Sequence, residues 1–371
     1  MSRLIKASLL AIVTLTLLAH SQEVAIHGFG AWGYGKTDGN RYLTGSEEGD
    51  YYTSNFALNV TASPNENLTI PTQVYWVLNS GEMELELDFA FAHWNFSDAI
   101  NFVIGKVKQP FGIYAEIFDV GTIRPMFSLP RGLYGNTGFA AESYCGMGFN
   151  GFFTVENDWG INYDLYGGAI ALEEPFSLEE KSVEMGSSHE SALIVTDVIG
   201  GRLTVLPPLQ GLSFGISAYA GKTKADEDSG EAESSFGDYL TYGVHAEFLS
   251  DKWSVRSEYG ISNQKELTLT NAAYLEIAYK ITDHWQAASR YDWADIDVEG
   301  MEEGESSSLL EHNDLGFGIN YWFCPDFVLK LAYHRVDGNR FALPEDYSNT
   351  IDNDELNTKT NLISFGAQFS F

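Results

Sequence analysis

The feature that most constrains the fold is an alternation of apolar with small or polar residues along short runs of sequence. In the run 83–91, apolar residues occupy the odd positions, and Glu84, Glu86, Asp88 and Ala90 occupy the even ones. A period of two is typical of a β-strand whose two faces meet different surroundings. Three carboxylates on one face can point neither into a packed core nor into lipid. This face therefore requires a water-filled interior.

The same pattern predicts about sixteen strands in the chain. Their expected starts lie near Val24, Tyr51, Leu68, Met83, Ile100, Tyr144, Trp159, Leu193, Gly211, Tyr239, Lys252, Ala272, His284, Asn313, Phe327 and Leu362. The strands near residues 24, 100 and 193 alternate least clearly. Asp197 fits neither face of its strand, which predicts a β-bulge at that position.

The connections between these strands alternate in length. Tight turns, such as Glu156-Asn157-Asp158 and Thr282-Asp283-His284, are separated by mostly longer segments, such as 35–50 and 335–361. Membrane barrels have short turns at one end and long loops at the other. No run of about 18 apolar residues, the length of a spanning helix, follows residue 21. The sequence predicts one all-β domain over residues 22–371, a transmembrane antiparallel β-barrel.

Residues 1–21 have the features of a secretory signal peptide. Arg3 and Lys6 precede an apolar run, and Ala19-His20-Ser21 places small residues where a signal peptidase reads the chain. We expect export and cleavage before Gln22. The alternative, an N-terminal membrane anchor, fits less well because only polar and alternating sequence follows.

The charge balance is strongly acidic. Without Arg3 and Lys6, 19 basic residues oppose 52 acidic ones, a net charge of −33. Such a surface repels nucleic acid, so no nucleic-acid partner is expected. The acidic segments 173–190, 226–233 and 292–311 could hold calcium or magnesium that bridges surface lipid, although none has the spacing of a dedicated calcium loop. The sequence predicts no other cofactor.

The segment 108–143 interrupts the strand pattern. It contains Pro110, Pro125 and Pro130, so it is neither a long helix nor a strand. It is also too apolar for a disordered linker, and a long ordered loop is usually functional. We expect the segment to fold into the mouth of the barrel and narrow it, with its aromatic residues wedged against the wall.

Several of these features together resemble a known family. Sixteen strands, a long third external loop and a C-terminal phenylalanine resemble the trimeric porins of bacterial outer membranes. The run 105–112, Gly-Lys-Val-Lys-Gln-Pro-Phe-Gly, resembles a segment of the porin superfamily that includes the phosphate-selective porins. Phe369 and Phe371 resemble the terminal signal read by the barrel assembly machinery. The resemblance implies a homotrimer in contact with outer-membrane lipids and lipopolysaccharide, and a third loop that bends into the lumen.

The resemblance to the phosphate-selective porins does not extend to charge, because those depend on a dense basic lumen. Alternation predicts a lumen wall that contains Glu84, Glu86, Asp88, Lys106, Arg256, Glu258, Arg290 and Lys330. Further acids, Asp164, Glu247 and Glu276, are also expected to face inward. Rings of acidic side chains bias a pore toward cations.

Four charged residues of the long loop are the candidate pore constriction. Glu116 and Asp119 would oppose Arg124 and Arg131 across the lumen, and the resulting field would favour small polar solutes. Alternatively, these residues pair with one another or with the wall and only hold the loop in place. Both interpretations are consistent with passive diffusion of small hydrophilic solutes and a mild cation preference. A substrate-specific channel for a sugar or an organic acid is the alternative function.

No catalytic motif suggests an enzyme. The chain has no G-x-S-x-G, no Walker loop and no H-E-x-x-H, and His245 and His334 are expected on inward faces. Cys145 and Cys324 are expected at opposite ends of a barrel wall about 25 Å tall, so no disulfide is predicted between them.

Overall fold

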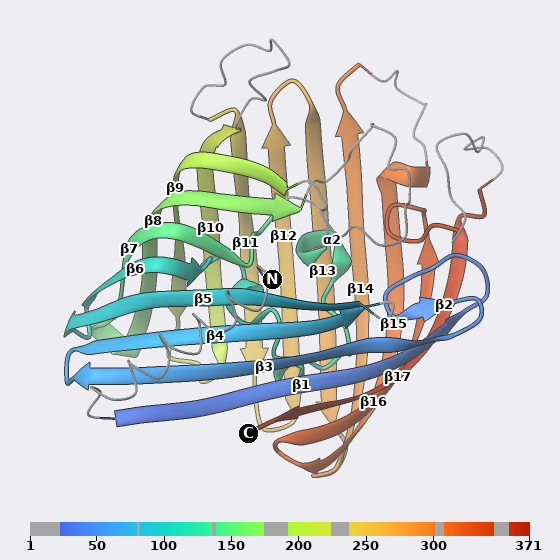
Figure 1. Ribbon diagram of the computed structural model, residues 1–371, viewed down its shortest axis with the longest axis horizontal. Coiled ribbons are helices and arrows are strands. Elements are labelled where there is room, and N and C mark those ends of the chain that lie inside the picture. The colour runs from blue at the N-terminus through green and yellow to red at the C-terminus, as the bar shows by residue number, and fades with distance from the viewer. Residues whose placement is uncertain are drawn as a thin grey trace, which may run out of the picture.

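The computed structural model describes residues 23–79, 82–135, 139–173, 192–223, 237–300, 308–344 and 356–371. Within these ranges the chain forms one sheet in which the first strand pairs with the last, so the barrel is closed (Figure 1). The described wall has sixteen antiparallel strands. They are β1 (Glu23–Thr37), β3 (Asp50–Asn65), β4 (Leu68–Asn79), β5 (Glu82–Ser97), β6 (Ile100–Lys108), β7 (Ser143–Val155), β8 (Trp159–Glu173), β9 (Ala192–Leu206), β10 (Leu212–Thr223), β11 (Tyr239–Leu249), β12 (Trp253–Gln264), β13 (Thr268–Lys280), β14 (Trp285–Val298), β15 (Glu311–Cys324), β16 (Phe327–Asp337) and β17 (Lys359–Ser370).

Two kinds of small element lie between the wall strands. The two-residue strand β2 (Gly45–Ser46) pairs in parallel with β1 inside the first loop. Short helical turns, η3 (Glu156–Asp158) and η4 (Ser308–Leu310), connect wall strands. Among the described residues, no helix is both long and apolar enough to cross a membrane.

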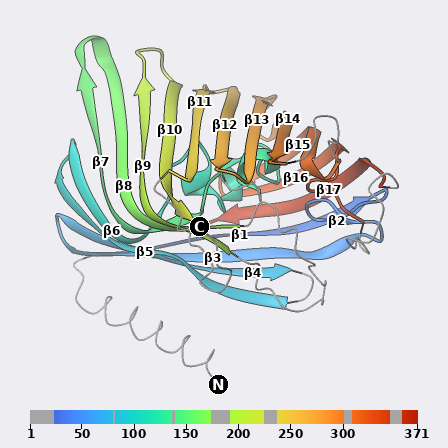
Figure 2. The same cartoon turned by 90° about the horizontal axis from the view of Figure 1, so that it is seen from above.

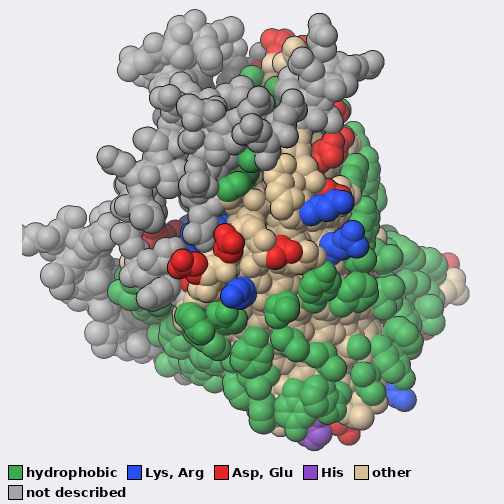
Figure 3. All heavy atoms as spheres, turned by 90° about the vertical axis from the view of Figure 1, so that its right-hand side faces the viewer, with side chains coloured by type: hydrophobic (Ala, Val, Ile, Leu, Met, Phe, Trp, Pro, Cys, Tyr) green, Lys and Arg blue, Asp and Glu red, His purple; other side chains and the backbone are tan. Residues whose placement is uncertain are grey.

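The predicted strands are confirmed, with one start displaced. Strand β13 begins at Thr268 instead of near Ala272, because the polar stretch 268–271 carries little apolar alternation. Outward side chains are exposed and apolar, including Met83 (68% exposed) and Ile199 (66% exposed). Figure 3 shows such hydrophobic side chains over a broad area of one side, with most charged side chains gathered above it. This band is what a lipid-facing barrel wall requires.

The predicted bulge at Asp197 is confirmed. Asp197 has φ 51°, and the pairing register of β9 shifts at this place against both neighbouring strands. A second bulge lies at Asp88, where the β4–β5 register passes from Leu87 to Phe89. Because of the extra residue, Phe89 pairs with Gln73 and lies with it on the inward face of the sheet. The prediction that residues 83–91 keep one strict alternation is therefore wrong beyond Leu87.

The chain ends close the barrel. Phe371 and Gly28 exchange two backbone hydrogen bonds of 3.0 and 2.9 Å, and Phe369 pairs with Gly30. The ring of Phe371 stacks on Phe56 with centroids 6.1 Å apart. Phe369 and Phe371 therefore form part of the pairing that closes the wall.

Between β6 and β7 the chain leaves the wall and runs inside the barrel. This internal loop, residues 109–142, contains η1 (Ala115–Ile117), η2 (Gly121–Ile123) and the one-turn helix α2 (Arg131–Tyr134). Seen from above, these turns lie within the ring of strands (Figure 2). As expected, Phe111, Tyr114, Phe127 and Tyr134 of the loop are buried, each at most 9% exposed. Phe118 was expected there too but is only partly buried.

Candidate functional site: the internal loop and the wall that faces it

Carboxylates of β12 and β13 hold two parts of the internal loop. The Tyr114 hydroxyl donates to Glu276 at 2.6 Å. Glu258 accepts from the Tyr134 hydroxyl at 2.7 Å and from the Ile113 backbone N–H at 3.1 Å. These acids are 1% and 4% exposed, and a buried carboxylate is tolerated when its oxygens are hydrogen-bonded. The pairs therefore fix the loop to the inner wall.

The middle of the loop is held by cationic side chains of β14 and β16. The Lys330 ammonium donates to three backbone carbonyls of the loop, those of Gly121, Arg124 and Met126. Arg290 donates to the Ser128 carbonyl at 2.7 Å. Both cationic side chains are 1% exposed. Backbone carbonyls in a loop lack sheet partners, so these donors satisfy acceptors that would otherwise be buried and unpaired.

Helix α2 is held by Asp292 of β14. The Asp292 carboxylate accepts hydrogen bonds from the backbone N–H groups of Arg131 and Gly132, which begin the helix and have no partner within it. A side chain at Gly132 would lie 2.7 Å from the Trp293 carbonyl oxygen. Glycine is therefore required for the helix to approach the wall this closely.

These anchors change the role of four residues predicted to line the lumen. Arg256, Glu258, Arg290 and Lys330 face inward, as alternation predicts, but the loop covers them and none is more than 8% exposed. Alternation identifies the face of a strand but not what lies over it. The four side chains bind the loop instead of facing the water of the lumen.

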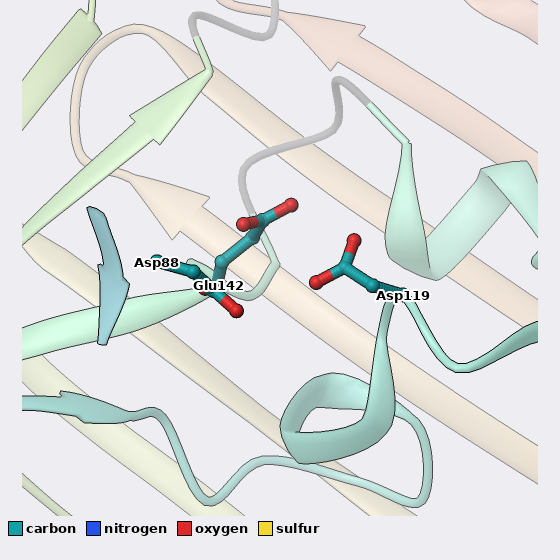
Figure 4. Close-up of side chains that lie close together, drawn as sticks. All are labelled: Asp88, Asp119 and Glu142. Carbon is teal, nitrogen blue, oxygen red and sulfur yellow. The ribbon is translucent and has the colours of Figure 1, made fainter. Parts of the chain in front are cut away.

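The opposite edge of the loop meets β5 and β6 at Lys108. The Lys108 Nζ lies 2.6 Å from Asp88 Oδ1, 3.2 Å from Asp119 Oδ2 and 3.9 Å from Glu142 Oε2. Figure 4 shows the three carboxylates close together, with Asp88 on the wall and Asp119 and Glu142 on the loop. Glu142 is 40% exposed at its side chain, whereas Asp88 is 2% exposed. The group therefore opens to the lumen through Glu142.

A second base, Arg202 of β9, binds the neighbouring part of the loop. Its guanidinium contacts Glu116 at 2.5 Å and Asp164 of β8 at 2.9 Å. Sequence reasoning missed Arg202, because the alternation of β9 is broken by the bulge at Asp197. One signal could have identified it. The next residue, Leu203, points outward and is 40% exposed, so Arg202 points inward.

The two loop arginines do not oppose the two loop acids as predicted. Arg124 is buried and donates to the carbonyls of Phe118 at 2.8 Å and Phe127 at 3.1 Å. The Arg131 guanidinium lies over the Phe341 ring, 5.2 Å from its centroid. Within the described residues, neither arginine forms an ion pair. The partners of Glu116 and Asp119 are instead Arg202 and Lys108.

Lys106 does not belong to the lumen wall, which corrects its predicted position. It pairs with Cys145 in β7, and residues paired across a ladder point to the same side of the sheet. That side carries Ile104 and Met147, which are 44% and 53% exposed on the outer surface. Lys106 therefore points outward, and its ammonium donates to the Leu87 carbonyl at 2.7 Å.

Glu84 and Glu86 complete the charged surface beside the loop. They pair with Val77 and Tyr75 of β4, and they share the inward face with Asp88. We define the loop–wall cluster as Glu84, Glu86, Asp88, Lys108, Glu116, Asp119, Glu142, Asp164 and Arg202. It has seven acids and two bases, a net charge of −5 when all are ionised.

Two predicted cation-binding segments, 173–190 and 226–233, lie outside the described residues except for position 173, and 292–311 is described only in part. The signal peptide also lies outside them. Cys145 and Cys324 are both free and exposed, in β7 and at the end of β15.

No protein-family model and no curated protein matches this sequence. Solved structures do. The outer membrane channel DcaP of Acinetobacter baumannii aligns with 94% of this chain and 97% of its own, at 10% identity and a TM-score of 0.59. The anion-selective porin from Comamonas acidovorans aligns with 94% and 99%, at 10% identity and a TM-score of 0.58. OmpF of Salmonella typhi aligns with 95% and 99%, at 13% identity and a TM-score of 0.56.

At these identities the likeness is one of fold. It extends over 94–95% of this chain and over 97–99% of each neighbour. The protein has the closed sixteen-stranded barrel fold of the outer-membrane porins.

Proposed function

We propose that this protein forms a water-filled channel in the bacterial outer membrane, through which small hydrophilic solutes diffuse passively. The main support for the proposal is the internal loop. Hydrogen bonds attach it to the inner wall at β12–β14 and β16, and its charged residues contact the wall at β6 and β9. Glu116 and Glu142 of the loop are each 40% exposed at their side chains. Carboxylates exposed to this extent need water around them, which supports a hydrated interior. The proposal assigns the protein no catalytic role.

The same cluster supports a mild preference for cations. Its surplus of acids over bases would concentrate cations beside the loop, since a charged ring at a narrow place biases ion passage. The Comamonas neighbour is described as anion-selective, whereas the loop–wall cluster defined above has more acids than bases. The bases Lys108 and Arg202 are each shared by at least two acids.

The proposal is tested by swelling of liposomes that contain the purified protein. Small sugars and amino acids should enter at rates that fall with solute size, without saturation. Liposomes without protein give the baseline. A saturable rate for one sugar or organic acid would favour the substrate-specific alternative, and no swelling above the baseline would contradict a diffusion channel. A hydrolase assay in detergent tests the absence of catalysis separately.

Assembly and surroundings follow from the same proposal. A trimeric neighbour, OmpT of Vibrio cholerae, has the same fold at a TM-score of 0.56 and 11% identity. We infer a homotrimer here, seated among outer-membrane lipids and lipopolysaccharide through the apolar band. Insertion by the barrel assembly machinery, and bridging of lipopolysaccharide by divalent cations at the acidic outer loops, belong to the proposal.

Ion preference should depend on pH near neutrality. Desolvation and the neighbouring Asp119 carboxylate raise the pKa of Glu142 to about 8, against the opposing effect of Lys108. Glu142 is thus neutral at pH 6 and gains a negative charge as the pH rises through about 8. Cation preference, measured as reversal potential in a salt gradient, should increase over this interval. Glu142→Gln should abolish the change, and an undiminished pH response in that variant would contradict the assignment.

A further inference from the structure

Lys108 occupies an unusual position for a base beside an acidic pore. Its ammonium lies among three carboxylates that come from three places in the chain: β5, the middle of the loop and the end of the loop. The Lys108 side chain is only 10% exposed. The lysine is therefore held inside the cluster and does not extend freely into the lumen.

The three carboxylates have the spacing of a cation site. One oxygen from each of Asp88, Asp119 and Glu142 lies within 4.8 Å of the others. Calcium binds oxygen ligands at about 2.3–2.6 Å, so ligands on opposite sides of one ion lie about 5 Å apart. In this protein the space between the oxygens is taken by the Lys108 ammonium. The ammonium of Lys108, which is part of the chain, is therefore the cation of this cluster. It leaves no space for a metal ion between the three carboxylates.

We propose that Lys108 determines the ion specificity of the channel by acting as a built-in counter-ion. It fills the position that would otherwise hold a divalent cation and keeps such ions from lodging in the pathway. The inference rests on the proposed channel function and adds a residue-level mechanism to it. With Lys108 present, the three acids and the base have a net charge of −2 when ionised; without it, the same oxygens have a net charge of −3 around an empty centre.

Two consequences follow, and the second distinguishes this role from simple attachment of the loop. First, removing the ammonium should increase the preference for potassium over chloride, because a positive charge is lost beside the pathway. Second, it should make the potassium current sensitive to calcium, because hard cations prefer clustered carboxylate oxygens. If the lysine only held the loop, its loss would loosen the loop and widen the path, and calcium would not block the current.

The test compares single channels of the wild type and of Lys108→Met in planar bilayers, with calcium chloride added at millimolar concentration. The wild-type potassium current should be nearly unchanged, whereas the variant should lose most of its current and recover it when calcium is chelated. Lys108→Arg, which keeps the charge, should behave as the wild type. Lys106→Met is the matched control, because Lys106 lies two residues away and points outward.

Adding Asp119→Asn to Lys108→Met should relieve the calcium block, since one of the three carboxylates is lost. If Lys108→Met does not assemble, Lys108→Gln has the same expected result. A wild-type channel that is itself blocked by calcium, or a conducting Lys108 variant with unchanged reversal potential and no block, would overturn the inference. Absence of any wild-type conductance would instead overturn the proposed channel function.

Discussion

Replacing Lys330 by methionine is expected to raise the single-channel conductance and the noise of the open current. The ammonium of Lys330 donates to three loop carbonyls and is 1% exposed. Methionine has a similar length but no donor. Each buried acceptor left unpaired costs about 1–3 kcal/mol, and the loop can avoid this cost by moving into the water of the lumen. The loop would then fluctuate away from β16 and widen the path.

The matched control for this prediction is Lys280→Met. Lys280 lies at the turn end of β13, with a side chain that is 46% exposed. Among the described residues, its one ion pair is to exposed Asp283. Its loss should leave conductance unchanged. Both variants should first be shown to form the folded barrel, by the temperature dependence of their gel mobility. A folded Lys330→Met channel with wild-type conductance and noise would show that this anchor does not position the loop.

Replacing Phe371 by alanine is expected to reduce the amount of assembled protein in the outer membrane several-fold. The backbone of Phe371 closes the barrel against Gly28, and alanine preserves those hydrogen bonds. The Phe371 side chain is 57% exposed, so its removal should cost little folding free energy. The expected loss therefore reports recognition of the terminal aromatic during insertion.

Phe323→Ala provides the comparison. Phe323 is 53% exposed near the end of β15, so it is an equally exposed aromatic residue that is not terminal. The variant should assemble at the wild-type level. Purified Phe371→Ala should refold in detergent and melt within a few degrees of the wild type. Normal membrane levels of Phe371→Ala would contradict a role for this residue as an assembly signal.

The wall could be predicted from sequence because lipid and water impose opposite demands on the two faces of every strand. Alternation located all sixteen strands and predicted the bulge at Asp197, where an acidic residue fitted neither face. The same reasoning failed at Asp88. That carboxylate continues a perfect alternation in sequence, and only its pairing with β4 reveals the extra residue.

The partners of the charged residues could not be predicted in the same way. Glu116 and Asp119 were expected either to oppose arginines of their own loop or to pair with the wall, and the sequence did not decide between the two. Their partners, Arg202 and Lys108, belong to the wall. Such contacts depend on how a loop of irregular backbone turns in three dimensions, which no periodicity records. Inward orientation likewise did not reveal that the loop would cover Lys330.

Lys106 illustrates a related limit. Its assignment to the lumen was wrong, because Lys106 lies on the same side of β6 as exposed Ile104 and pairs with outward-facing Cys145. Two inward positions near it, Val103 and Val107, are apolar and pack in one buried cluster with residues of the internal loop. Polarity therefore did not identify the inward face of this strand.

The most direct test of the central claim is the reversal potential of the purified protein in a planar bilayer under a potassium chloride gradient. The loop–wall cluster has a net charge of −5 when ionised, and it predicts discrete conductance steps with a reversal potential displaced toward that of potassium. Neutralising Glu86 and Glu116 together should move the potential toward zero. Chloride preference in the wild type, or a membrane that stays non-conducting after insertion is verified, would contradict the account.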